Sequence, residues 1–450
     1  MFSLNRIAPS ERLRFVTLAS LLFINAIVVQ SNGVVATSGF IAKVGLQQLL
    51  IVWTIDNIVI LIGSGLYSIF VDRMKRTDLM TILFSVAAVT YLVMYALFVL
   101  GAPSYLSYTL LMVLNDQQWI LFGLAIWALA NDTFSVSESK RLFPLMAVVA
   151  LLGGIAGNAL ATGISWLATQ VPGLEDGVRT TYMLMLFNAA LMAASAGLVV
   201  GVLRRLNIVT HQDRSSDGPV AIIKEGISFV QEIPAFRYLA LSMLVVGFGL
   251  NTLQYQFFFS AEQVFSDPNA LGAFYGAVRM VRMISLLLIQ GLLTTWVLQN
   301  IGFRSVFIVL PVVMLGALVA PILLPGIIAI TIGDYLVRIT MDGVDESARQ
   351  SFIGLVPDER RGRVNAFFNG YLYPIGSIAS CGLIGLTIYL EGNGVFPEGF
   401  AATFYLTIAA LLVASAIYSV RRLRANYDSS LLNWRLRRRK RGSVLSNLDL

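Results

Sequence analysis

The chain has 450 residues, of which 57% are hydrophobic and only 13% are charged. Soluble globular proteins usually have about 45–50% apolar and about 25% charged residues, and the mean hydropathy here is +0.77. This composition excludes a soluble enzyme, a disordered protein and a nucleic-acid-binding protein. Apolar runs of about 20 residues recur, which predicts an all-α integral membrane protein rather than a β-barrel.

Apolar windows predict about 12 transmembrane helices. Their approximate cores, in chain order, are residues 15–36, 46–70, 79–101, 105–130, 143–168, 181–203, 236–259, 270–296, 304–323, 325–346, 365–390 and 399–420. The single cysteine, Cys381, excludes an internal disulfide, and the only histidine, His211, lies in a polar stretch between spans.

A long polar stretch divides the chain near its middle. Within it, Ile223, Ile227 and Val230 recur at helical spacing, which predicts a short amphipathic helix at the cytoplasmic surface. The predicted domains are an N-terminal six-helix bundle over 1–203, a linker over 204–234, a C-terminal six-helix bundle over 235–421 and a basic tail over 422–450. Two such bundles with pseudo-twofold symmetry and a cytoplasmic linker are the layout of major facilitator transporters.

The distribution of Lys and Arg predicts the orientation. With both termini in the cytoplasm, most of the 32 basic residues fall in tails and cytoplasmic loops. The net charge of +7 is therefore attributed to topology and not to nucleic acid. The basic run from Arg437 to Arg441 predicts an anchor for anionic membrane lipids, with a partner-binding tail as the alternative. Short loops favour a bacterial inner membrane.

Several charged residues are predicted near the middle of the bilayer. A charge there costs at least ~2.5–3.5 kcal/mol on insertion scales, so each needs a partner or a water-filled cavity. These residues are Asp56, Asp116, Arg279, Arg282, Asp334 and Arg338, with Asp342 one turn nearer the cytoplasm.

Arg279 and Arg282 are three residues apart and share a helix face. Two guanidinium groups there suit an anionic substrate, because each presents a planar fork to carboxylate or phosphate. The alternative is a pair neutralised by acidic residues on neighbouring spans. The spacing of Asp334, Arg338 and Asp342 predicts an Asp–Arg–Asp ladder, which either makes Arg338 tolerable or forms a gate that opens on substrate binding.

Asp56 and Asp116 are predicted either to carry a proton or to pair with Arg279 or Arg282. Polar runs in the first and fourth spans either line the same cavity or hydrogen-bond to neighbouring helices. They include Gln30, Asn32, Asp116 and Gln117. Glycines in the fifth and eleventh spans predict close helix packing. No P-loop, metal-binding motif or nucleophile–base pair is found, so we predict no cofactor, no metal and no catalytic residue.

The stretch from Trp127 to Leu145, WALANDTFSVSESKRLFPL, resembles a family segment. Its counterpart follows the fourth span of the ATP:ADP antiporters (NTP/NDP exchange transporters) of obligate intracellular bacteria and plastids. The region from Arg338 to Gly376 is similar to that family's tenth and eleventh spans. The family is a distant branch of the major facilitator superfamily, so the resemblance implies a secondary transporter of nucleotides.

The chain departs from the family at two lysines that serve nucleotide transport there. The matching positions are Ser31, before Asn32-Gly33, and Pro374. We therefore hypothesise that Arg279 and Arg282 replace the lysines as phosphate partners. The stretch from Ser68 to Arg76 also resembles the major facilitator loop Gly-x-x-x-Asp-Arg-x-Gly-Arg-Arg without its glycines, which assigns Asp72 and Arg73 to a cytoplasmic gate.

The function predicted from the sequence is a secondary active transporter of a small, anionic or nucleotide-like solute. Its cavity is expected between the two halves, with alternating access by rocking of the halves. A proton-coupled exporter of drugs or metabolites is the alternative in the same class. A membrane scaffold or sensor that moves no solute is the alternative in another class.

Overall fold

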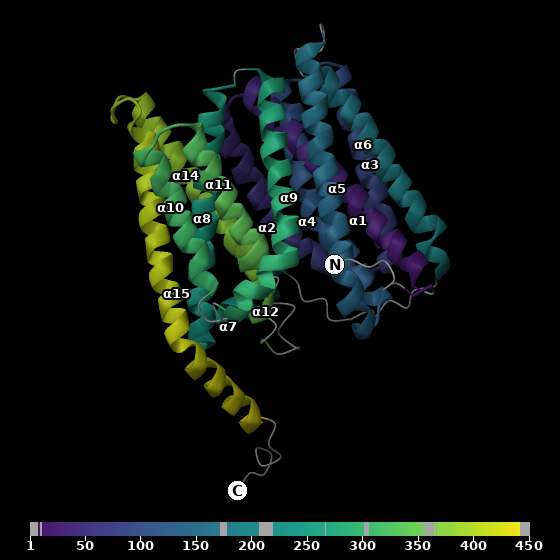
Figure 1. Ribbon diagram of the computed structural model, residues 1–450, viewed down its shortest axis with the longest axis vertical. Coiled ribbons are helices and arrows are strands. Elements are labelled where there is room, and N and C mark those ends of the chain that lie inside the picture. Colours follow the sequence, from purple (N-terminus) through teal and green to yellow (C-terminus); the bar gives the residue numbers. More distant parts are fainter. Residues whose placement is uncertain are drawn as a thin grey trace. The chain divides into compact units, whose positions relative to one another are not determined.

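The computed structural model is built from helices (Figure 1), and the residues that it describes contain no strand. The described residues are 8–9, 11–171, 178–206, 219–265, 267–300, 306–353, 356, 364–365 and 367–441. Among helical residues, side chains are also left undescribed at 64–73, 290–300 and 424–441, and at a few single positions. Asp72, Arg73 and the basic residues from Arg437 to Arg441 therefore lie outside the described side chains.

Eleven helices in the described part are long and apolar enough to cross a membrane. The predicted span over 325–346 falls on α11 (Ile327–Thr340), which is shorter. This helix continues through one π-helical turn, η4 (Met341–Asp345), into α12 (Glu346–Ile353). The prediction of an all-α, multi-pass membrane protein is confirmed.

The helices form two compact units, each made of several chain segments. Unit 1 comprises Met1–Val52, Leu66–Ser216 and Phe258–Leu288, and unit 2 comprises Trp53–Gly65, Asp217–Phe257 and Ile289–Leu450. The helices of unit 1 are α1 (Arg12–Lys43), α3 (Arg76–Val99), α4 (Ser104–Thr133), α5 (Val136–Gln170), α6 (Val178–Gly201), η2 (Leu203–Leu206) and the first part of α9 (Pro268–Asn300). The limits of the predicted domains stay a prediction.

Unit 2 contains the remaining helices. They are α7 (Pro219–Glu232), most of α8 (Pro234–Glu262), η3 (Val306–Ile308), α10 (Val309–Leu323), α11, η4, α12, the π turn η5 (Phe368–Leu372), α14 (Tyr373–Gly392) and α15 (Phe400–Arg441). The middle of α2 (Leu46–Arg73) also belongs to unit 2.

Local sequence explains several helix ends. Pro219, Pro234 and Pro268 each occupy the first helical position, where the missing N–H is not needed and the fixed φ suits a helix. Ser135 and Glu138 form a reciprocal capping box at the start of α5. Each capping group satisfies a backbone N–H that the first turn would otherwise leave without a partner.

Glycines bring α5 against the backbone of α1 in unit 1. A Cβ atom placed on Gly157 would lie 2.5 Å from the carbonyl oxygen of Ile27. Gly153, one turn earlier, faces the backbone of Phe23 in the same way. Only glycine permits this approach, because any side chain would overlap the neighbouring backbone.

A matching glycine contact joins α8 and α14 in unit 2. A Cβ atom on Gly247 would lie 2.8 Å from the carbonyl oxygen of Tyr373, and one on Gly376 would lie 2.8 Å from the backbone nitrogen of Phe248. The clustering of small residues in the fifth and eleventh spans thus marks two close helix crossings.

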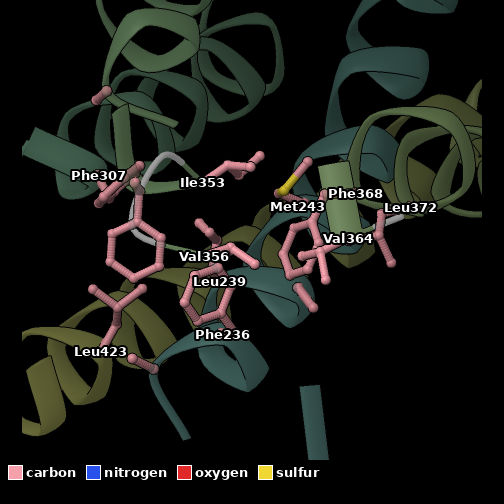
Figure 2. Packing of buried hydrophobic residues seen from close by; sticks show 14 of the residues in the cluster. Phe236, Leu239, Met243, Phe307, Ile353, Val356, Val364, Phe368, Leu372 and Leu423 are labelled. Atoms are coloured by element: carbon pink, nitrogen blue, oxygen red, sulfur yellow. The ribbon is translucent and has the colours of Figure 1, made fainter. Parts of the chain in front are cut away.

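Buried hydrophobic side chains of unit 2 form an apolar core (Figure 2). It brings together side chains from α7, α8, η3, α12, η5 and α15, among them Phe229, Phe236, Phe307, Phe352, Phe368 and Leu423. Helix α7 lies where the sequence predicts a short amphipathic helix. Of the predicted stripe, Ile223 and Val230 pack against this core while Ile227 is 45% exposed.

Candidate substrate-binding site

One face of α9 packs against α1 and α5 in unit 1. Gly272, Gly276, Arg279 and Met283 are spaced by four, three and four residues, so they share that face. A Cβ atom on Gly272 would lie 2.9 Å from the hydroxyl of Ser165 in α5 and 3.1 Å from that of Ser38 in α1. The small residues thus let α9 approach both helices closely.

Arg279 lies on this face of α9, and its guanidinium comes close to the backbone of α1. A Cβ atom on Gly33 would lie 2.8 Å from Nη1 of Arg279 and 3.3 Å from Nδ2 of Asn115. The guanidinium and the Asn115 amide therefore share the space that a side chain at position 33 would occupy. Arg282 is three residues further along, which turns it about 60° away from Arg279 around the helix. Both arginines are half-buried.

A chain of amide hydrogen bonds runs from α1 to Asp116 in α4. Nδ2 of Asn32 donates to Oδ1 of Asn115 at 3.3 Å and to the carbonyl of Leu111 at 3.4 Å. Nδ2 of Asn115 then donates to Oδ1 of Asp116 at 3.0 Å. Because Asn32 donates to two acceptors, its amide orientation is fixed. The chain ends in an amide that donates to the Asp116 carboxylate.

The other predicted residues of the first and fourth spans differ in their surroundings. Gln30 is buried, and its Oε1 accepts a 3.3 Å hydrogen bond from Nδ2 of Asn158 in α5. That bond ties α1 to α5 one turn beyond Gly154. Gln117 is half-buried. Unit 1 thus contains Gln30, Asn32, Asp116 and Arg279, together with Asn115 from the polar run that the sequence indicated in the fourth span. It also contains Asn158, which the sequence did not single out.

The predicted charges of the tenth span lie in unit 2. Nε of Arg338 donates to both carboxylate oxygens of Asp334, at 2.9 and 3.0 Å. The first half of the predicted Asp–Arg–Asp ladder is therefore present, and the charge of Asp342 also acts on Arg338. Asp56 is buried in the part of α2 that belongs to unit 2.

A neutral polar network near the α8–α14 crossing escaped the sequence analysis. Ser377 donates to Oδ1 of Asn251 at 2.9 Å, and Nδ2 of Asn251 donates to Ser380 and to Sγ of Cys381, both at 3.3 Å. Nδ2 of Asn57 in α2 donates to Ser377 at 3.1 Å. Asn, Ser and Thr are common inside helix bundles, so only the three-dimensional arrangement distinguishes these ones.

A second missed residue is Arg349 in α12, which is almost fully buried. It hydrogen-bonds to Glu346 and to Oδ1 of Asn369, and its guanidinium lies 5.2 Å from the ring centre of Tyr373. The segments around it include both π-helical turns of the described chain, η4 and η5. Its charge is neutralised locally by residues of its own helical segment.

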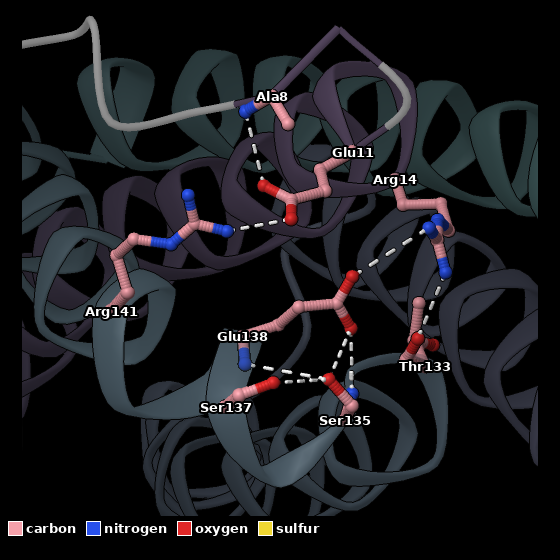
Figure 3. Close-up of polar contacts among 8 residues, drawn as sticks. All are labelled: Ala8, Glu11, Arg14, Thr133, Ser135, Ser137, Glu138 and Arg141. Carbon is pink, nitrogen blue, oxygen red and sulfur yellow. Dashed lines mark hydrogen bonds and ion pairs between the residues drawn. The ribbon is translucent and has the colours of Figure 1, made fainter.

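The start of α1 is joined to the α4–α5 turn by ion pairs and by a hydrogen bond from Arg14 to the carbonyl of Thr133 (Figure 3). Nη2 of Arg141 donates to Oε1 of Glu11 at 2.6 Å, and Arg14 lies 4.0 Å from Glu138. The backbone N–H and hydroxyl of Ser135 both donate to Glu138, and together with the charge of Arg14 they lower the pKa of Glu138. This cluster fastens the start of α1 to the α4–α5 turn.

The described residues contain no group of three or more His, Cys, Asp and Glu side chains placed to hold a metal ion. The polar cluster of unit 1 is instead suited to an anion, since it combines guanidinium groups with amides.

The fold defines the class of protein. A crystal structure of a mutant of the nucleoside transporter NupG aligns with a TM-score of 0.67 and 14% identity, over 91% of this chain and 99% of that one. A bacterial homologue of the iron transporter ferroportin, in its inward-facing state, aligns with a TM-score of 0.62 and 12% identity, over 93% and 99%. The chain therefore has the major facilitator fold of two six-helix bundles.

Sequence comparison gives the family. A profile of the TLC ATP/ADP transporter family matches residues 79–331, more than half of the chain. The protein belongs to this family, which confirms the resemblance seen in the sequence. It is a family of transporters, not of enzymes.

The curated relatives are distant. An ADP,ATP carrier protein 1 of Chlamydia muridarum is 23% identical over 209 residues, 44% of this chain and 38% of that protein. The plastidic ATP/ADP-transporter of Solanum tuberosum is 21% identical over 197 residues, 44% and 31%. The matches thus span only about a third of the length of these relatives.

Proposed function

We propose that the protein is a secondary active transporter that moves a small anionic, nucleotide-like solute across the membrane by alternating access. Arg279 supplies the positive charge that holds the solute's anionic group. The observation that carries this proposal is the position of Nη1 of Arg279 beside Gly33 and Asn115. Membership in the ATP/ADP transporter family supports the choice of solute.

Arg279 offers a replacement for the lysine that the family resemblance places in the first span. Ser31 stands at that place, and Gly33 lies two residues further along the same helix. A guanidinium from α9 therefore brings a positive charge to the same stretch of α1. Arginine is suited to this substitution, because its fork binds phosphate or carboxylate through two parallel hydrogen bonds.

The remaining predicted features complete the proposal. Arg282, Asp116, Gln117, Asn32 and Gln30 contribute to substrate binding. Asp334, Arg338 and Asp342, with Asp56, Asp72 and Arg73, contribute to coupling or gating. Both termini face the cytoplasm of a bacterial inner membrane, and the basic C-terminal tail binds anionic lipid.

Transport by purified protein in proteoliposomes tests the proposal. Labelled AMP, ADP and ATP are offered to vesicles that are empty or preloaded with the same unlabelled nucleotide. We expect saturable uptake by the wild-type protein and at least a tenfold loss in Arg279→Gln, with partial recovery in Arg279→Lys. Arg204→Gln is the matched control, because Arg204 pairs with Asp78 at an exposed helix end of the same unit.

Two results would contradict the proposal. One is normal uptake by Arg279→Gln. The other is no uptake of any nucleotide by well-folded wild-type protein, which would direct the search to other solutes under a proton gradient, with Asp56 and Asp116 as the first positions to neutralise.

A further inference from the structure

The helices of unit 1 carry few charges away from their ends. The sequence places three there, the positive Arg279 and Arg282 on α9 and the negative Asp116 on α4. Lys43, Arg76, Asp132, Arg141 and the other charged residues of these helices lie near helix ends. The formal charges of Arg279, Arg282 and Asp116 in the candidate site therefore sum to a single positive charge.

Asp116 belongs to the same polar cluster as Arg279. The Asn115 amide that donates to Oδ1 of Asp116 at 3.0 Å also occupies the space beside Gly33 that Nη1 of Arg279 reaches. Nδ2 of Asn32 donates to Oδ1 of Asn115, so the Asn115 amide is oriented with its N–H groups toward the carboxylate. The formal charge of Asp116 is therefore counted together with those of the two arginines.

This balance limits the charge that a transported anion can carry. A phosphomonoester carries about −1.5 to −2 near neutral pH, and each further phosphate in a chain adds about one more negative charge. Charge without a partner is costly at bilayer depth. The site therefore suits one phosphate group better than two or three.

Resting on the proposed function, we infer that the solute is a nucleotide-like anion with a single phosphate group, such as a nucleoside monophosphate. ADP and ATP bind more weakly, because the charge of the two arginines is offset in part by Asp116, which accepts a hydrogen bond from the Asn115 amide that lies with Arg279 beside Gly33. Asp116 thus acts as the residue that sets the charge of the accepted substrate.

Equilibrium binding of labelled AMP, ADP and ATP to purified protein in detergent, without Mg²⁺, tests this inference. We expect AMP to bind at least about tenfold more tightly than ATP, with ADP between them. Unlabelled adenosine and inorganic phosphate are used as competitors. Adenosine tests the need for the anion, and phosphate tests whether the phosphate group alone is enough.

The sharper readout is the ratio of AMP to ADP affinity within one variant, since a partly unfolded sample changes both affinities equally. Asp116→Asn adds one net positive charge and should shift this ratio toward ADP by about fivefold or more. Asp132→Asn, at the end of the same helix, removes a carboxylate that pairs with Arg76 and should leave the ratio unchanged.

The outcomes separate the two proposals. ADP and ATP binding at least as tightly as AMP, with a ratio that Asp116→Asn does not move, overturns the inference alone. Binding of none of the three nucleotides by folded wild-type protein overturns the proposed function as well. A shift of the same size in Asp132→Asn would also contradict a specific role for Asp116.

Discussion

The crossing of α1 and α5 in unit 1 and the crossing of α8 and α14 in unit 2 are built alike. In each, glycines bring two helices into backbone contact, at Gly153 and Gly157 in one and at Gly247 and Gly376 in the other. In each, an asparagine beyond the glycines bonds across the crossing. Asn158 does so in unit 1, and Asn251 in unit 2.

The two crossings differ in what lies beside them. The face of α9 that packs against α1 and α5 brings Arg279 to the α1–α5 crossing. The α8–α14 crossing is bordered by the neutral network of Asn57, Ser377 and Asn251. Small residues and amides are thus a shared means of packing helices in a membrane and do not by themselves indicate a binding site. Arg349 lies over Tyr373 at the second crossing, but it hydrogen-bonds to Glu346 of its own helix. Arg279 lies beside Gly33 and the Asn115 amide, which makes unit 1 the candidate for anion binding.

The largest effect on stability is expected where glycine touches backbone. Gly157→Ala and Gly376→Ala each force a methyl group against a neighbouring main chain that cannot move independently. Overpacking of this kind costs about 1–3 kcal/mol, so the melting temperature in detergent should fall by several degrees. Loss of the folded peak in size-exclusion chromatography after heating measures it.

Matched controls lie on the same helices. A Cβ atom on Gly163 in α5 or on Gly382 in α14 meets no atom within 4 Å. Gly163→Ala and Gly382→Ala should therefore be neutral or slightly stabilising, as alanine is the better helix former. Equal losses in both sets of variants would mean that the crossings are not held by glycine contacts.

A smaller difference is expected between the two asparagines. Asn251 connects Ser377, Ser380 and Cys381, whereas Asn158 connects Gln30 and the carbonyl of Gly154. Asn251→Ala should cost about 1–2 kcal/mol, because several buried polar groups lose a partner. Asn158→Ala should cost less. The same heating assay decides the order, and a reversed order would place the more important network in unit 1.

A change at Gly33 should alter binding without a large loss of stability. The new methyl group of Gly33→Ala meets the flexible end of Arg279, so the guanidinium is displaced and its charge is kept. Nucleotide affinity should fall by about threefold to tenfold with a nearly unchanged melting temperature. Gly123→Ala in α4 is the control, since a Cβ atom there is in open space. Unchanged affinity in Gly33→Ala would separate Arg279 from the binding site.

The smallest effect concerns the ends of α1 and α5. Hydrogen bonds from Ser135 and the charge of Arg14 lower the pKa of Glu138, so the folded protein favours the ionised carboxylate. This stabilisation is present above the ordinary pKa of 4.5 and is lost as the pH falls through the lower folded pKa. Glu138→Gln should cost about 0.5 kcal/mol at about pH 7, and this cost should shrink as the pH falls below 4.5 and through the lower folded pKa. A cost that does not change with pH would contradict this.

Much of the fold follows from the sequence. Apolar runs define the helices, and their number and the polar stretch over 204–234 indicate the major facilitator layout. The exception is the span over 325–346, whose charges at Asp334, Arg338 and Asp342 shorten its apolar part. This segment is helical, but it includes the π-helical turn η4, which no residue pattern in the sequence predicts.

The candidate site was predictable as a set of residues but not as an arrangement. Buried polar side chains stand out in apolar helices, which identified Gln30, Asn32, Asp116 and Arg279. Sequence spacing placed Arg279 and Arg282 on one face. It could not show that Arg279 is the one beside Gly33, because that depends on how α9 is rotated against α1. Asn251 and Arg349 were missed because they bond to residues of other helical segments. Asn251 bonds to Ser380 and Cys381, and Arg349 bonds to Asn369.

The most direct test of the account is the affinity for AMP of two arginine variants, one in each unit. Arg279→Gln removes the charge beside Gly33, and Arg237→Gln removes an exposed arginine of α8 whose guanidinium donates to the carbonyl of Gln231. The account predicts at least a tenfold loss of affinity in the first and less than a twofold change in the second. Equal affinities for the wild type and Arg279→Gln, or equal losses in both variants, would contradict it.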